Sequence, residues 1–110
     1  MSPAPADRLQ GTLDLLILRT LEREPLHGWA VSRRIRETSD DRLQVNQGSL
    51  YPALHRLEDQ GWVDAEWGVV ETGKRAKLYR LTTAGRRQLR REEAGWLEFV
   101  RAVTLVLDTA

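Results

Sequence analysis

The sequence predicts a mainly α-helical fold with a small β-hairpin, namely a winged helix-turn-helix followed by a long C-terminal helix. Three observations predict it. Two short helical segments, over 28–38 and about 46–60, lie on either side of a turn. A run with period-two alternation then begins at residue 63 and leads through a basic turn into a second strand-like run. The closing segment, from about 83 to 107, has the pattern of one amphipathic helix.

Length and composition limit the possible classes of protein. A chain of 110 residues suits one domain, and with no cysteine it forms neither disulfides nor thiolate metal sites. It lacks an apolar run of membrane-spanning length, and its first ten residues do not resemble a signal peptide, so we expect a cytoplasmic protein. We divide it into a flexible arm (1–9), a winged helix-turn-helix domain (10–82) and a dimerisation helix (83–110).

The first helix, predicted over 10–22, is apolar on two sides. One stripe consists of Leu13, Leu16, Ile17 and Leu21, and a second of Leu15 and Leu18. A helix that is apolar on two sides should be buried on both. We therefore expect one side to face the core and the other to face a second subunit.

The second helix, predicted over 28–38, has a simpler pattern. Val31 and Ile35 lie four residues apart and face inward, whereas the outward positions carry Arg33, Arg34 and Arg36. A loop follows at 39–41, and residues 43–45 are interpreted as a single short strand. His27 and Trp29, at the start of this helix, are interpreted as capping or packing residues.

The third helix ends at Gly61 and completes the helix-turn-helix pair. Its start lies between Asn46 and Ser49, and both are residue types that cap helices. If Ser49 is the cap, Pro52 occupies the third helical position, where its missing N–H costs no hydrogen bond. The buried seam is then formed by Leu50, Leu54 and Leu57.

A hairpin with a basic tip follows Gly61. One face of its first strand carries Val63, Ala65, Trp67 and Val69, and we interpret this face, like Trp62, as core or hairpin packing. The sequence ETGKR at 71–75 forms the turn, and the partner strand returns through Leu78, Tyr79 and Leu81. We call this hairpin the wing.

The last helix changes character along its length. Its first half carries four arginines, and its second half is apolar, with Trp96, Phe99 and four aliphatic residues. A long terminal helix has little of its own domain to pack on, so its apolar half is expected to bind a second copy of the chain. The predicted homodimer interface comprises Leu13, Ile17, Trp96, Val100, Val103 and Leu107.

The charge is strongly segregated along the chain. Eight of the 17 basic residues and none of the 16 acidic residues lie between Lys74 and Arg91, although the net charge is only +1. The run crosses a loop, a strand and a helix start, which a single solvated helix face does not explain. The segregation favours contact with a polyanion, and a helix followed by a cationic hairpin favours double-stranded DNA.

The predicted DNA-binding residues lie on the third helix and the wing. Lys74, Arg75 and Lys77 would contact phosphates or the minor groove. The helix start and the following turn would reach base edges or phosphates. The full set is Gln47, Ser49, Tyr51, His55, Arg56, Lys74, Arg75 and Lys77. The alternatives are capping for Gln47 and Ser49, and packing on the wing for Tyr51.

Four segments resemble the PadR family of bacterial transcriptional regulators: LDLLILRTL (13–21), HGWAVSRRI (27–35), GSLYPALHRLEDQGWVDAEWG (48–68) and KRAKLYRLTTAGRRQL (74–89). The single helix at the end resembles the short subgroup of that family. Leu78 departs from the pattern, because a tyrosine often stands there. The resemblance implies a homodimeric repressor that binds an inverted-repeat operator, controls efflux, detoxification or stress genes, and is released by a small molecule.

A candidate effector site lies around Trp96. Two-fold symmetry could bring two Trp96 side chains together, and paired indoles would stack a planar aromatic ligand. The wall of this site would be completed by Leu15, Leu18, Asp14, Phe99 and Val100. The alternative is a closed dimer core in which Trp96 only packs.

Other functions lack support in the sequence. It has no nucleophile constellation, phosphate-binding glycine loop or metal triad, and only two histidines, so we predict no enzyme, no cofactor and no metal site. The competing hypotheses are an architectural or RNA-binding winged helix and a protein-interaction module without an effector. A cationic wing argues against a module that has lost nucleic-acid binding.

Overall fold

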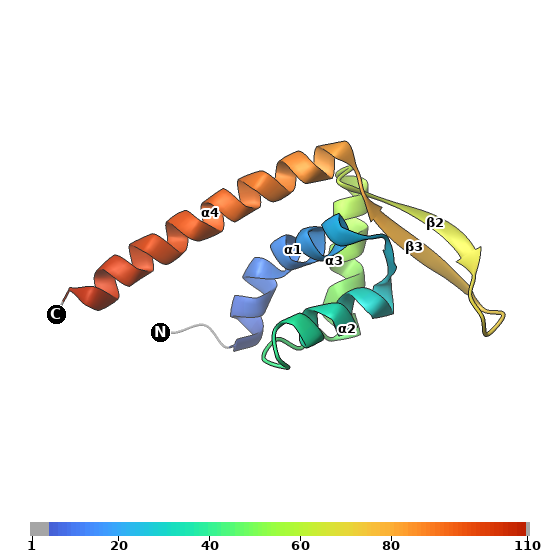
Figure 1. Ribbon diagram of the computed structural model, residues 1–110, viewed down its shortest axis with the longest axis horizontal. Coiled ribbons are helices and arrows are strands. Elements are labelled where there is room, and N and C mark those ends of the chain that lie inside the picture. Colours follow the sequence, from blue (N-terminus) through green and yellow to red (C-terminus); the bar gives the residue numbers. More distant parts are fainter. Residues whose placement is uncertain (1–4, 110) are drawn as a thin grey trace.

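The computed structural model describes the backbone of residues 5–109 and the side chains of residues 12–109. Within that range the chain forms four helices and three strands, arranged as an elongated molecule of 58 × 28 × 22 Å (Figure 1). In chain order they are α1 (Pro5–Arg23), β1 (Leu26–His27), α2 (Gly28–Thr38), α3 (Gln47–Asp59), β2 (Val63–Val69), β3 (Arg75–Leu81) and α4 (Thr83–Asp108).

The core lies where α1, α2 and α3 meet the base of the sheet. The predicted inward residues of α2 and the predicted seam of α3 are buried, which confirms the helical periodicity. The largest fully buried side chains are Leu13, Ile17, Leu18, Leu50, Leu54, Leu57, Leu89, Val31 and Val63. The described residues contain no helix that is long and apolar enough to cross a membrane.

The first helix corrects two expectations. Leu13, Ile17 and Leu18 are at most 1% exposed in the core of their own subunit, so these three offer no surface to a partner or ligand. The helix packs against α2, α3 and α4, which bury most of both apolar stripes but leave Leu15 and Leu16 half-buried. Its backbone is helical from Pro5, so the arm expected over 1–9 is helix at 5–9, and residues 1–4 lie outside the described range.

The sheet has three antiparallel strands in the order β1-β3-β2, one more than the predicted hairpin. In the added pair, Leu26 lies opposite Tyr79 and His27 opposite Leu78. The short strand expected at 43–45 is wrong, because those residues are extended without a strand partner. A two-residue strand such as β1 is too short to show alternation in a sequence.

The wing, residues 63–81, begins on the core at its base and projects away from the core toward its tip (Figure 1). Val63 at its base is 1% exposed, whereas Trp67 is 55% and Val69 72% exposed on the same face. Of the two predicted alternatives, core or hairpin packing, the base of this face is core, whereas Trp67 packs within the hairpin beside Arg75 and Lys77. The outer half of the hairpin therefore extends past the core, and its large apolar residues are exposed.

The start of α3 is set by Asn46, whose side chain accepts a hydrogen bond from the Ser49 N–H at 2.9 Å. This resolves the two predicted starts in favour of the earlier one. Pro52 then lies inside the helix, past the first turn, and withholds one backbone N–H from the helical ladder. The recognition helix of the helix-turn-helix pair is thus one turn longer at its exposed end than a Ser49 start would give.

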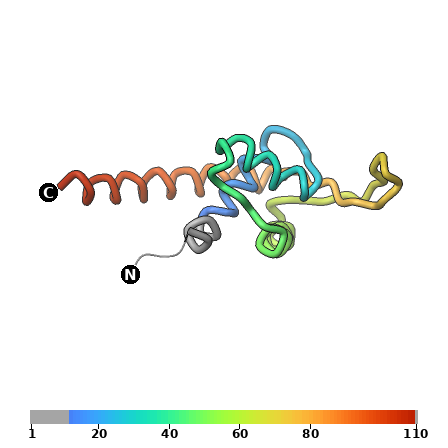
Figure 2. The backbone as a smooth tube through the Cα atoms, turned by 90° about the horizontal axis from the view of Figure 1, so that it is seen from below, coloured from blue at the N-terminus to red at the C-terminus, as the bar shows by residue number. Residues whose placement is uncertain are grey.

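The long α4 begins on the core and ends far from it. Thr82 caps it by accepting from the Gly85 N–H at 2.9 Å and is itself anchored by donating to the Gly61 carbonyl at 2.7 Å. Leu89 is fully buried, but from Trp96 onward every residue of the helix is exposed. Figure 2 shows this half of α4 and the wing extending at opposite ends of the molecule.

Candidate nucleic-acid interface

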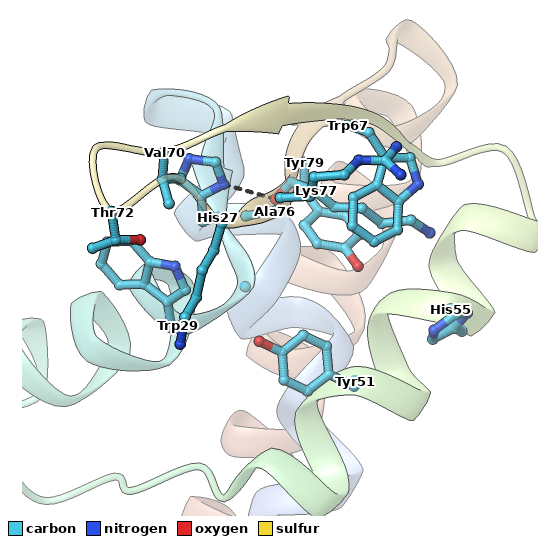
Figure 3. A pocket seen from close by; sticks show the side chains of 13 residues that line it. His27, Trp29, Tyr51, His55, Trp67, Val70, Thr72, Ala76, Lys77 and Tyr79 are labelled. Carbon is cyan, nitrogen blue, oxygen red and sulfur yellow. Dashed lines mark hydrogen bonds between the residues drawn. The ribbon is translucent and has the colours of Figure 1, made fainter.

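An open groove of about 550 Å³ lies between α3 and the wing, with the start of α2 as its third side (Figure 3). None of the described residues that line it is acidic. The lining residues are His27, Gly28, Trp29, Tyr51, His55, Trp67, Val70, Thr72, Lys74, Arg75, Ala76, Lys77 and Tyr79. Cations and aromatic rings in one concave surface suit a polyanion with planar groups.

The α3 side of the groove comes from residues one turn apart. Tyr51 and His55 both line it, with Tyr51 half-buried and His55 exposed. Gln47 is exposed and Ser49 half-buried in the first turn, outside the groove. Of the five predicted residues of this helix, the structure therefore brings Tyr51 and His55 to the groove and places Gln47 and Ser49 in the first turn beside it.

Gly28 determines how closely α2 approaches the Tyr51 ring. A Cβ atom at Gly28 would lie 2.7 Å from Tyr51 Cε1, which is shorter than side-chain atoms tolerate. Gly28 therefore permits the two helices of the pair to meet at the ring. The Tyr51 ring thus lies against α2 while sharing the groove with residues of the wing, and both DNA contact and packing remain open to it.

Arg56 does not line the groove. Its guanidinium forms an ion pair with Asp14 of α1, and both side chains remain partly exposed. The residue predicted to bind DNA therefore ties the recognition helix to α1. Asp14, predicted to be a polar group of the effector site, is occupied by the same contact.

The three predicted wing cations have different surroundings. Lys74 and Arg75 are exposed, and the Arg75 guanidinium carbon lies 5.0 Å from the centroid of the Trp67 ring. The side chain of Lys77 is only 22% exposed, and its Nζ lies 3.3 Å from Glu58 Oε1. Lys74 and Arg75 are thus available for phosphates, whereas Lys77 already has an anionic partner.

His27 and Trp29, interpreted as capping or packing residues, also line the groove. His27 Nδ1 lies 2.9 Å from the Lys77 carbonyl oxygen, and its ring stacks on Trp29 at 5.7 Å. A carbonyl oxygen only accepts, so Nδ1 carries the proton. Trp29 is 46% exposed and has Arg33 over its ring at 5.3 Å. An exposed indole beside a basic helix face was the available signal for this part of the site.

Tyr79 forms the floor at the core end of the groove. Burial raises the pKa of its hydroxyl, and the nearby Glu58 carboxylate and Tyr51 raise it further. The hydroxyl therefore stays protonated and neutral at physiological pH. Tyr79 is the one lining residue of the wing that is fully part of the core cluster.

Several arginines of the basic run and of α2 are neutralised by acids of the same chain. Arg80 on the opposite face of the wing pairs with Asp64 and Glu66, and Arg90 pairs with Glu22 and Glu93. On α2, Arg33 pairs with Glu37 and Arg34 with Glu24. The uncompensated positive charge of the run is therefore smaller than the sequence suggests, and it is divided between the wing tip, with Lys74 and Arg75, and the start of α4, with Arg86, Arg87 and Arg91.

A second surface lies on the outer half of α4. The residues predicted for the dimer interface there, Trp96, Val100, Val103 and Leu107, are 42%, 38%, 40% and 77% exposed. Phe99 lies beside Trp96, with ring centroids 6.2 Å apart. Three residues of α1 were predicted for the effector site. Asp14 and Leu15 are half-buried and keep some exposed surface, whereas Leu18 is fully buried.

Comparison with known proteins identifies this arrangement. The chain is 28% identical over 103 residues to an uncharacterised protein of Lysinibacillus sphaericus, covering 94% of both. It is 40% identical over 67 residues to a transcriptional regulator of Mycobacterium tuberculosis, covering 61% of this chain and 62% of that protein.

Solved structures of transcriptional regulators have the same fold. A PadR family transcriptional regulator from Eggerthella lenta superposes with a TM-score of 0.83 at 34% identity, covering 96% of this chain and 89% of the other. A transcriptional regulator from Clostridium thermocellum gives a TM-score of 0.82 at 28% identity, covering 89% of this chain and 95% of the other. The model of the PadR-like family of transcriptional regulators matches residues 17–91, more than half of the chain. With its winged-helix fold and its cationic groove, the chain belongs to the PadR-like family of transcriptional regulators.

Proposed function

We propose that the protein is a homodimeric, sequence-specific repressor that binds an inverted-repeat operator in double-stranded DNA. The observation that carries the proposal is the groove between α3 and the wing, which presents Lys74, Arg75 and four tryptophan and tyrosine rings without an acidic lining residue among those described. The family consists in general of non-enzymatic DNA-binding regulators. Action on chromosomal DNA would place the protein in the cytoplasm.

The apolar outer half of α4 supports the dimer. It exposes several large apolar side chains on a helix that has left its own core, and such a surface is normally covered by another chain. Two recognition helices related by a two-fold axis would read half-sites about one helical turn apart. Target genes for efflux, detoxification or stress responses fit a family of regulators released by small molecules.

Selection of genomic fragments followed by footprinting tests the proposal. The expected result is protection of an inverted repeat with half-sites spaced by about one helical turn. Neutralising Lys74 and Arg75 together should weaken protection, whereas Arg101→Gln should not, because Arg101 belongs to the outer half of α4. Figure 1 shows that half of α4 extending away from the wing. Binding that is equal for all sequences would favour an architectural protein, and no binding would favour a protein-interaction module.

A second candidate function is the recognition of a planar aromatic effector by paired Trp96 side chains. The partly exposed Trp96, with Phe99 beside it, supports the proposal. Leu15, Asp14 and Val100 would complete the wall, and the buried Leu18 would lie behind it. Binding there would change the relative position of the two winged domains and thereby release the operator.

A further inference from the structure

Lys77 lies at the point where the wing leaves the core, and it is held by both its backbone and its side chain. Its carbonyl oxygen accepts a hydrogen bond from His27 Nδ1 at 2.9 Å. Its ammonium group donates to Glu58 Oε1 at 3.3 Å. His27 is the last residue of β1 and Glu58 is in the last turn of α3, so one residue of β3 is connected to two other elements.

Aromatic rings enclose the ammonium group of Lys77. The centroid of the Trp67 ring lies 5.6 Å and that of Tyr79 5.9 Å from Nζ. Trp67 is the cross-strand partner of Lys77. Arg75, two residues before Lys77 on β3 and therefore diagonal to Trp67, places its guanidinium over the same indole. Figure 3 shows Lys77 and Trp67 together on the wing side of the groove, across from Tyr51 and His55 on α3.

These contacts make Lys77 different from the two exposed cations of the wing. With side-chain exposures of 22% and 31%, Lys77 and Glu58 are largely shielded from solvent, so each would be left as an unpaired charge if the other moved away. Contact with a phosphate would require Lys77 to break its pair with Glu58 and its ring contacts. Lys74 and Arg75 can reach a phosphate without breaking an ion pair of that kind.

We propose that the Glu58–Lys77 pair, covered by Trp67, is a strut that sets the angle of the wing relative to α3, and that Lys77 does not contact DNA. The inference rests on the proposed function, because the angle set by the strut would allow the wing to enter one groove of the duplex while α3 enters the next. Lys77 and Glu58 are then positioning residues. Trp67 has two roles, since it covers the strut and orients the Arg75 guanidinium that does contact phosphate.

Glu58→Gln gives opposite results under the two possible roles of Lys77. If Lys77 contacts a phosphate, removing its acidic competitor near DNA should leave operator affinity unchanged or increase it. If the pair is a strut, Glu58→Gln should weaken operator binding by about tenfold, comparable to losing a hydrogen bond to a charged group. Lys77→Gln should weaken binding similarly, with an unchanged dependence of affinity on salt, because no phosphate contact is lost.

Two further variants complete the test. In Glu58→Lys/Lys77→Glu the charges are exchanged, and operator affinity should recover to within about threefold of the unmodified protein, an incomplete recovery typical of coupled neighbours. Glu66→Gln is the matched control, because it removes an equal charge from the opposite face of the wing, where Glu66 pairs with Arg80. It should not weaken binding.

A measurement without DNA separates failure of the strut from failure of the proposed function. Amide hydrogen exchange of the free protein over residues 63–81 should accelerate in Glu58→Gln and Lys77→Gln but not in Glu66→Gln. Unchanged exchange, unchanged or tighter operator binding by Glu58→Gln, or a salt dependence that falls by one phosphate in Lys77→Gln would each overturn the proposal. If the unmodified protein bound no operator, the exchange result would still decide whether the strut exists.

Discussion

Individual glycines set two close approaches in this protein. A Cβ atom at Gly85 would lie 2.0 Å from the Trp62 carbonyl oxygen, which is backbone and cannot move aside. At Gly28 the obstacle is the Tyr51 ring, which can rotate away. The first glycine is therefore required for folding, whereas the second is required for placing a side chain of the groove.

Gly85→Ala should destabilise the protein by about 3 kcal/mol, the cost of forcing an atom into a filled site. Gly95→Ala in the same helix is the matched control, because nothing lies within 4 Å of a Cβ atom at that position. It should stabilise the helix by up to about 1 kcal/mol. Urea unfolding measures both at matched oligomeric state, and equal effects of the two substitutions would contradict the close contact.

Gly28→Ala should leave the free energy of unfolding nearly unchanged but weaken operator binding, because the Tyr51 ring must rotate out of its position beside α2. Tyr51→Phe is the comparison, since it keeps the ring and removes only the hydroxyl. Filter binding with the operator fragment measures both. If Gly28→Ala bound as tightly as the unmodified protein, the ring position would be irrelevant to recognition.

At the scale of elements, sequence periodicity predicted the helices well and the sheet less well. The apolar spacing in α2 and α3 identified their buried faces, because each helix has one face on the core. The strand β1 escaped prediction because two residues show no period. The sequence left Trp67 as core or hairpin packing, because alternation shows which residues share a face but not where the core ends.

The candidate site was predictable where it depended on composition and not where it depended on pairs distant in sequence. Lys74 and Arg75 followed from the basic turn. The pairs Arg56–Asp14 and Lys77–Glu58 join residues 42 and 19 positions apart, and no local pattern encodes them. The ion pairs of Arg56 and Lys77, two predicted DNA contacts, were not foreseen because their acidic partners come from other elements.

The helix and the wing should contribute to recognition in different ways. Neutralising Lys74 and Arg75 together should weaken binding to every sequence and reduce the salt dependence by about one unit for each phosphate contact. Substitutions of Gln47 or His55 should change base preference instead, because base contacts and not phosphate contacts carry sequence information. Titrations at several salt concentrations on operator and scrambled DNA measure both. An unchanged salt dependence in the Lys74/Arg75 variant would contradict this division.

At the scale of the whole molecule, α4 connects the winged domain to the proposed second subunit. Deleting the chain from Glu93 onward should give monomeric or insoluble protein, because the exposed apolar residues of α4 are the largest such surface described. A milder variant, Val103→Asp, places a charge in the middle of that surface and should give a folded monomer that binds the operator weakly. Sedimentation measures the mass, and Val103→Asp protein that stays dimeric would exclude α4 as the interface.

A planar effector site at Trp96 requires both subunits, because each subunit contributes one indole. Titrating planar cationic dyes while following tryptophan emission should show quenching and, in parallel, release of the operator, because stacked indoles attract flat cations. The chain has four tryptophans, so the assignment depends on comparing variants. Trp96→Ala should lose quenching and operator release together, whereas Trp29→Phe should retain both, since Trp29 lies in the groove on α2. Quenching that persists in Trp96→Ala but disappears in Trp29→Phe would move the ligand to the DNA-binding groove, where it would compete with the operator directly instead of acting through the dimer.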